Sequence, residues 1–129
     1  MNTTTDSWIA EFFSSIDHMD AEAFAGHFSS SGHFRFANHP PLEGPGAIAA
    51  GAQGIFGLLT GIRHEVLKSW QAAGDILVEG VVHYHRAADD RQMAYPFLSV
   101  FEFEQGPTSP VKSYRVFVDS HELFLPPVD

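Results

Sequence analysis

The chain has 129 residues, a formal net charge of −9 and no cysteine, and 44% of its residues are hydrophobic. That length fits a single domain, residues 1–129, with a core of its own. The shortage of lysine and arginine argues against nucleic acid or an anionic membrane as a partner, because both are bound through basic surfaces. The lack of cysteine excludes disulfide bonds, thiol catalysis and thiolate metal sites.

The N-terminal residues, Met1 to Ser7, are polar and have neither the basic nor the apolar stretch that begins a secretion signal. No run of the sequence approaches the roughly 18 consecutive apolar residues that a membrane-spanning helix needs. We therefore expect a cytoplasmic protein.

Two short helices are expected at the start of the chain. Apolar residues recur at helical spacing over residues 6–17, namely Trp8, Ile9, Phe12, Phe13 and Ile16. Asp20 is a good N-cap for a second helix over residues 21–28. The run from Ser29 to Gly32 is expected to end that helix.

A strand and a third helix are expected in the middle of the chain. Residues 33–38 are typical of a strand, which must end before Pro40 and Pro41 because proline cannot donate to a sheet ladder. Residues 44–60 are small, apolar and uncharged. They predict a helix packed closely against another element, although internal glycines weaken it.

Four long strands are expected in the second half, over residues 62–72, 75–87, 91–105 and 111–124, with turns or a loop between them. Helices followed by antiparallel strands predict an α+β domain. A period of two assigns the inner face of the sheet to Gly80, Val82, Tyr84, Tyr95, Phe97, Ser99, Phe101, Phe103, Tyr114, Val116 and Val118. Because this face is aromatic, carries hydroxyl groups and has almost no ionisable group, it predicts an apolar pocket.

The order helix, helix, strand, helix and four-strand meander resembles the nuclear transport factor 2-like superfamily, particularly its SnoaL-like branch, over nearly the whole chain. The segments that carry the likeness are IDHMDAEAF (16–24), GHFRFANHPPLEGPGAI (32–48), GIRHEVLKSW (61–70) and SYRVFVDSHELF (113–124). They identify a fold and not a reaction. The resemblance implies a cone-shaped, curved antiparallel β-sheet wrapped around three N-terminal helices, an apolar pocket inside the cone, and a homodimer.

Ketosteroid isomerases share this fold, and their functional groups are missing here. The resemblance aligns their carboxylate base with Phe36 and their two oxyanion donors with Phe12 and Ser99. None of these three side chains can take over its role, so isomerisation by that mechanism is not expected.

Limonene epoxide hydrolases also share the fold, and they use an Asp–Arg–Asp set on two inner strands. The resemblance aligns that set with Gly80, Val82 and Val116, which again lack the chemistry. Asn38 matches a water-binding amide of that family. The resemblance thus implies the pocket but neither mechanism.

Histidines are the remaining candidates for acid–base chemistry. His64 shares a strand face with Ile62, and it is either a core histidine bonded to a backbone carbonyl or a general base that lines the pocket. His39 lies either in an exposed loop or at the pocket mouth. His83 and His85 lie about 7 Å apart on one strand face and could share a metal. The resemblance turns that face away from the pocket, so we expect no metal site and no cofactor.

Three tyrosines and a serine are the polar groups expected on the inner face. They either ring a ligand carbonyl as hydrogen-bond donors or are ordinary strand residues whose hydroxyls reach the pocket rim. The residues expected to contact a ligand are Phe12, Phe36, Asn38, Phe56, Val82, Tyr84, Tyr95, Phe97, Ser99, Tyr114 and Val116.

Two functions remain open from the sequence. In the first, the domain binds a small, largely apolar ligand that carries a carbonyl or hydroxyl group. In the second, it is a SnoaL-like enzyme of the cyclase, isomerase or dehydratase type. His64 would then be the base, tyrosines would donate to the developing oxyanion, and Asn38 would orient a water or a substrate oxygen.

The outer face of the sheet is expected to be a contact between two copies of the chain. It carries Val81, Leu98, Val100 and Phe117, which form too large an apolar surface to be left in water. His83, His85 and Arg115 are expected near that contact. Asp119 falls out of phase with the inner face and is expected to accept bonds from local N–H groups where the last strand ends.

Overall fold

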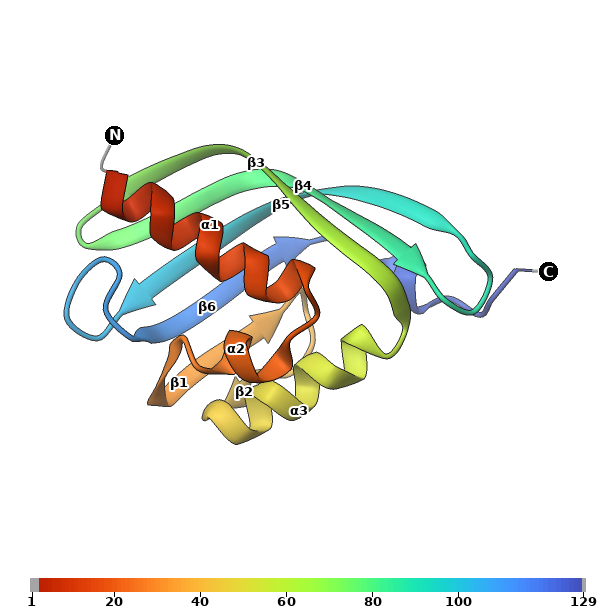
Figure 1. The fold of residues 1–129 in the computed structure, drawn as a ribbon, viewed down its shortest axis with the longest axis horizontal. Coiled ribbons are helices and arrows are strands. Elements are labelled where there is room, and N and C mark those ends of the chain that lie inside the picture. The colour runs from red at the N-terminus through yellow and green to blue at the C-terminus, as the bar shows by residue number, and fades with distance from the viewer. Residues whose placement is uncertain (1–2, 129) are drawn as a thin grey trace.

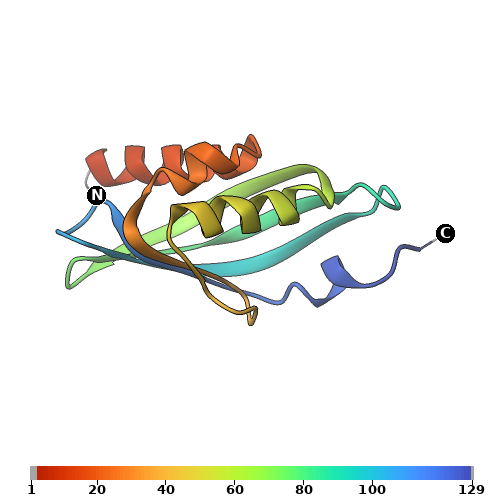
Figure 2. The same ribbon diagram turned by 90° about the horizontal axis from the view of Figure 1, so that it is seen from below.

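The computed structural model describes residues 3–128. Three helices lie on one side of a curved six-stranded sheet (Figures 1 and 2), which is the α+β cone expected from the sequence. The helices are α1 (Thr3–Asp17), α2 (Ala21–Ala25) and α3 (Pro45–Phe56). The strands are β1 (Phe28–Phe36), β2 (Leu42–Glu43), β3 (Leu59–Ala72), β4 (Asp75–Arg86), β5 (Gln92–Phe103) and β6 (Val111–Val118), and a short 3-10 helix, η1 (His121–Phe124), follows them.

The strand order is β2-β1-β6-β5-β4-β3. Strands β3 to β6 form the expected antiparallel meander. Strand β1 lies on the far side of β6 and runs parallel to it, with Phe34 opposite Tyr114 and Phe36 opposite Val116. The first and last long strands therefore pair with each other, and the N-terminal helices that precede β1 lie over the concave face of the meander (Figure 1).

The inner and outer faces of the sheet follow the alternation in the sequence. Val82, Phe97 and Val116 are at most 6% exposed, and they face the helices. Phe117 on the opposite face is 52% exposed. A register shift of one residue would have reversed these side chains, so the predicted register is confirmed.

Several element boundaries differ from the expected ones. Ser29 to Gly32 belong to β1 and do not end a helix, because Phe28 pairs with Val111 and the Ser29 hydroxyl donates to Glu104 (2.6 Å). Helix α3 ends at Phe56, where Gly57 caps it, and so it is shorter than expected. Strand β6 ends at Val118 rather than at residue 124, since Asp119 accepts a hydrogen bond from the backbone of His121 (3.2 Å) and η1 begins there.

Stacked aromatic rings form the centre of the core. The Tyr114 ring lies nearly parallel to Phe101 on one side (4.7 Å between centroids, 5°) and to Phe34 on the other (5.3 Å, 6°). Phe12 of α1 meets both Phe101 and Tyr114 edge-on, at 4.8 and 4.9 Å. Such offset and edge-to-face pairs stabilise a core beyond the burial of their area.

A buried ion pair fixes the end of the chain to the β4–β5 hairpin. Arg86 and Asp89 are almost fully buried, and Arg86 also donates to the backbone oxygens of Glu122, Leu123 and Leu125. The hydrogen bond from Arg86 holds the pKa of the Asp89 carboxyl well below its ordinary value. Because that pKa is lowered, the stability from this pair is present at neutral pH and is lost only as acid protonates Asp89.

A glycine in the middle of β4 permits the strong curvature of the sheet. A Cβ at Gly80 would lie 2.2 Å from the Glu65 carbonyl oxygen and 2.9 Å from the Phe97 ring. Strand β3 has a register shift between Val66 and Lys68, directly opposite this position. Since the closest atom belongs to the backbone, it cannot move aside cheaply.

We predict that Gly80→Ala lowers the free energy of unfolding by about 2–3 kcal/mol, because the added methyl group overpacks a backbone contact. Gly54→Ala is the matched control. A Cβ there would meet nothing within 4 Å, and alanine in a helix should raise stability by about 0.5–1 kcal/mol. Urea denaturation of both variants measures the difference, and equal stability of the two would contradict this account of the curvature.

Candidate functional site

A small internal cavity lies between the helices and the concave face of the sheet. Its volume is about 40 Å³, far below the roughly 300–1,000 Å³ of a typical ligand pocket. It is lined by Ile16, Phe24, Phe34, Phe36, Ala52, Ile55, Phe56, Ile62, His64, Val82, Tyr84, Phe97, Tyr114 and Val116. The cavity is thus almost entirely apolar, with one imidazole and two phenols in its wall.

His64 on β3 is bonded to Asp17 at the end of α1. The His64 Nδ1 atom lies 2.6 Å from an Asp17 carboxylate oxygen, and the His64 backbone N–H donates to the same carboxylate at 3.0 and 3.2 Å. The His64 side chain is 7% exposed. A carboxylate acceptor at Nδ1 favours the tautomer with its proton on Nδ1, which leaves the Nε2 lone pair free.

Asp17 lies at a position where a carboxylate is unfavourable without a partner. It is the last residue of α1, where the helix dipole disfavours a negative charge. The two donors of His64 offset that cost, and Phe13 packs on the imidazole with its ring centroid 4.7 Å away. His64 is thus held by a carboxylate, whereas the sequence left open a backbone carbonyl.

Two phenols face the same cavity as His64. Among the described residues, neither Tyr84 nor Tyr114 has a hydrogen-bond partner at standard geometry, and both are at most 4% exposed. Burial raises the pKa of Tyr84 and of Tyr114 well above the ordinary value. Both phenols therefore stay protonated at neutral pH, so each can donate a hydrogen bond to a ligand.

The structure brings eight of the twelve predicted site residues to the cavity wall. These are Phe36, Phe56, His64, Val82, Tyr84, Phe97, Tyr114 and Val116. The sequence missed Asp17, although it lies in the segment IDHMDAEAF. No sequence pattern around Asp17 indicates that it is the partner of a histidine 47 residues away.

Four predicted residues lie elsewhere. Phe12 is in the core beneath the cavity, fully buried among other rings. The Tyr95 hydroxyl donates to the Met93 sulfur (3.0 Å). Ser99 is fully buried close to Tyr114, and its hydroxyl partly offsets the rise in the Tyr114 pKa. Among the described residues, the Ser99 hydroxyl has no partner at hydrogen-bonding geometry. Asn38 lies in the turn after β1 and lines a groove outside the cone.

A surface cleft of about 280 Å³ adjoins the internal cavity. Phe34, Phe36 and Ile55 line both spaces, so their side chains form the wall between them. On the outer side, Phe36 stacks on His39 (5.7 Å, 22°), and His39 in turn contacts Phe124 (4.9 Å). His39 is therefore near the mouth of the cavity, which is one of its two expected positions.

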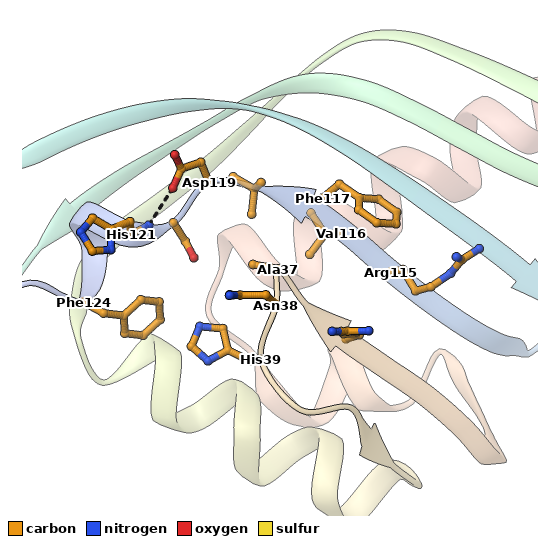
Figure 3. A pocket seen from close by; sticks show the side chains of 12 residues that line it. Ala37, Asn38, His39, Arg115, Val116, Phe117, Asp119, His121 and Phe124 are labelled. Carbon is orange, nitrogen blue, oxygen red and sulfur yellow. Dashed lines mark hydrogen bonds between the residues drawn. The ribbon is translucent and has the colours of Figure 1, made fainter.

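A larger groove, about 670 Å³, lies outside the cone between β1, β6 and η1 (Figure 3). We call it the outer groove. Asn38 and His39 project into it from the turn after β1, and Asp119 and His121 lie where β6 ends. Its lining residues are Arg35, Ala37, Asn38, His39, Arg115, Val116, Phe117, Val118, Asp119, Ser120, His121 and Phe124.

The two outer histidines pair with carboxylates and not with each other. His83 Nε2 lies 3.3 Å from Glu65, and His85 pairs with Asp90. Within residues 3–128, no three side chains of metal-binding type gather at one place. No helix of that part of the chain is long and apolar enough to cross a membrane.

The protein-family model for the SnoaL-like domain matches residues 9–107. The chain belongs to this family. A search of curated proteins returns no significant match to this SnoaL-like domain.

Solved structures share the fold at low sequence identity. A putative SnoaL-like polyketide cyclase from Shewanella denitrificans has a TM-score of 0.81 at 10% identity and covers 93% of both chains. A hypothetical protein from Catenulispora acidiphila with a ketosteroid isomerase-like fold, in complex with trimethylamine, has a TM-score of 0.77 at 13% identity, covering 85% of this chain and 83% of its own. An LEH-like epoxide hydrolase from M. tuberculosis has a TM-score of 0.73 at 13% identity, covering 95% and 87%. Identities this low establish the fold alone.

We predict that the His64 imidazole carries its proton on Nδ1 when it is neutral. Nitrogen-15 NMR of the imidazole ring distinguishes the two tautomers directly. In the Asp17→Asn variant the carboxylate is lost, so the two tautomers should become more evenly populated. A wild-type ring that carries its proton on Nε2 would contradict the arrangement described here.

Proposed function

We propose that this SnoaL-like domain is an enzyme that removes a proton from carbon next to a carbonyl group of a small, largely apolar ligand, with His64 as the base. The observation that supports this proposal most is the His64–Asp17 pair in the wall of an apolar cavity. A general base needs a free lone pair and a fixed orientation, and the carboxylate at Nδ1 supplies both. The resemblance aligns the isomerase and hydrolase carboxylates with Phe36, Gly80 and Val116, so we infer that a base in this chain comes from another position.

The proposed first step moves one proton. The Nε2 lone pair of His64 takes the proton from the carbon, and the electron pair of the C–H bond moves onto the carbonyl oxygen to form an enolate. Asp17 stabilises the imidazolium that results, because the 2.6 Å contact becomes a charge-assisted hydrogen bond. Tyr84 or Tyr114, both protonated at neutral pH, then donates to the enolate oxygen.

The fate of the enolate distinguishes the three reaction types. Return of the proton to another carbon is an isomerisation, loss of a neighbouring hydroxyl as water is a dehydration, and attack on a second carbonyl carbon is a cyclisation. All three begin with the same step at His64. The apolar wall favours each of them, since excluding water strengthens the interactions of the phenols with the oxyanion.

Entry of a ligand requires a change in the cavity wall. The internal volume of about 40 Å³ does not hold an organic ligand, whereas the adjoining cleft measures about 280 Å³. Rotation of Phe36 would join the two spaces, because its side chain separates them. We therefore propose that the ligand enters between Phe36 and Ile55, under the contact of His39 with Phe124.

Proton exchange tests the first step without knowledge of the product. We expect the protein to catalyse deuterium incorporation next to the carbonyl of a small aryl ketone, such as 1-indanone, in D₂O. His64→Ala should slow the exchange by about 100-fold or more. The measurement is the loss of the α-proton signal by NMR.

His83→Ala is the matched control, because His83 also pairs with a carboxylate but on the outer face of the sheet. Exchange should be unchanged in this variant. If the ketone binds in the cavity but exchanges equally in wild type and in His64→Ala, the enzyme proposal fails. The domain is then a binding protein for a small apolar ligand, which is the other function that the sequence left open.

We also propose a homodimer through the outer sheet face, centred on β4 and β5. Trp70 is 39% exposed on this face, and Leu98 is half-buried between the strands. Phe117 on β6 lies at the edge of this contact, beside the outer groove. Light scattering at micromolar concentration should give the mass of two chains, and Leu98→Glu should give the mass of one, since it places a charge in the contact. A wild-type monomer at that concentration would rule this assembly out.

A further inference from the structure

The outer groove brings two arginines together on neighbouring strands. Arg35 of β1 and Arg115 of β6 are direct partners in the parallel register, and both line the groove. The whole chain has only seven lysines and arginines and a net charge of −9. Two of those seven basic residues thus stand side by side on a protein that is otherwise acidic, and their mutual repulsion is unfavourable unless an anion lies between them.

The two guanidinium groups have hydrogen-bonding capacity left over. Among the described residues, Arg35 has no hydrogen-bond or ion-pair partner. Arg115 pairs with Glu102 through a single nitrogen (3.3 Å) and lies over the Phe117 ring (5.9 Å). Its Nε atom is buried and, within residues 3–128, has no acceptor. A buried donor without an acceptor is costly, and a modest rotation of Arg115 toward the groove would give this donor an acceptor if an anion were bound there.

The rest of the groove indicates what the anion is attached to. Phe117 and Phe124 supply apolar surface, and Asn38 adds an amide from the turn after β1 (Figure 3). Asp119 directly follows the end of β6, four residues after Arg115, and so lies roughly 13 Å away at about 3.3 Å per residue. Its negative charge repels an anion from that end, so an anion is favoured only beside the arginines.

We propose that the outer groove binds a small organic carboxylate, with the carboxylate between Arg35 and Arg115 and an apolar body along Phe117 toward Phe124. Guanidinium groups bind planar carboxylates through paired hydrogen bonds. Arg35 and Arg115 are out of phase with the residues of β1 and β6 that line the His64 cavity, so the carboxylate position lies on the opposite face of the sheet. The two spaces share Val116, and the groove shares His39 and Phe124 with the adjoining cleft. It does not rest on the proposed function.

Fluorine NMR with 4-fluorobenzoate as the probe tests the proposal. We expect saturable binding at low millimolar concentration, with 4-fluorobenzamide, which has the same shape without the charge, binding at least tenfold more weakly. Arg35→Gln should weaken binding of the benzoate at least fivefold, because it removes one of the two cations. Arg63→Gln is the matched control. Arg63 is also exposed and without a partner among the described residues, but it lies on β3 outside the groove, so binding should be unchanged.

Three results would overturn the proposal. These are equal binding of the benzoate and the benzamide, equal loss of binding in Arg35→Gln and Arg63→Gln, and tighter binding of inorganic phosphate than of the benzoate. The last would indicate a site for a bare anion. Melting curves of both variants establish that they are folded, and His64→Ala should bind the probe as the wild type does, which separates this site from the cavity.

Discussion

The stacking of Tyr114 between Phe34 and Phe101 is the contact on which the rest of the structure depends. The three rings come from β1, β6 and β5, so the stack joins the N-terminal strand to the meander. Phe12 of α1 packs edge-on against two of these rings, Phe101 and Tyr114. With α1 fixed in this way, its last residue, Asp17, meets His64 on the opposite edge of the sheet.

Polar side chains lie in and beside the wall of the cavity, namely His64 with its partner Asp17, Tyr84 and Tyr114. Burying an imidazole, a carboxylate and two phenols without partners would cost several kcal/mol. The pairing of His64 with Asp17 removes most of that cost for two of the groups, while the two phenols keep unused donors. An apolar core of the same volume would be more stable, so retained donors that face a cavity favour a role in binding or chemistry. On the other face of β6, Arg115 and Phe117 line a second hollow, because successive side chains of a strand point in opposite directions.

Much of the fold could be predicted from the sequence because one face of each strand is buried. Alternation fixed the register of β4, β5 and β6, and the family resemblance supplied the cone. Ser29 to Gly32 could not be assigned correctly, since serine and glycine favour turns locally. In the structure they are an irregular part of β1, between its pairs with β6 at Phe28 and at His33. The parallel direction of β1 against β6 could not be predicted either, because it depends on contacts between distant parts of the chain.

The candidate site was predicted less completely, for a different reason. Residues that line it, such as Val82, Tyr84 and Phe97, follow from strand periodicity. The partner of His64 does not, because Asp17 ends a helix and no spacing rule links a helix terminus to a strand 47 residues later. Periodicity also cannot give the volume of the cavity, which depends on how far Phe36 and Phe56 fill the cone. Phe12 and Ser99 face inward as expected, yet other rings cover them.

The pairing of β1 with β6 has a consequence for how the protein folds. Phe28 pairs with Val111, so about two thirds of the chain lies between the two strands of this ladder. Closing so long a loop loses chain entropy before the contact forms, and folds that depend on such distant pairs form slowly. During synthesis β1 cannot pair with β6 until β6 has left the ribosome. Until then, the phenylalanine side chains of the N-terminal helices and of β1 stay exposed to solvent. The hairpins β3–β4 and β4–β5 join strands that are adjacent in sequence, so they can form early, and we expect folding to begin there.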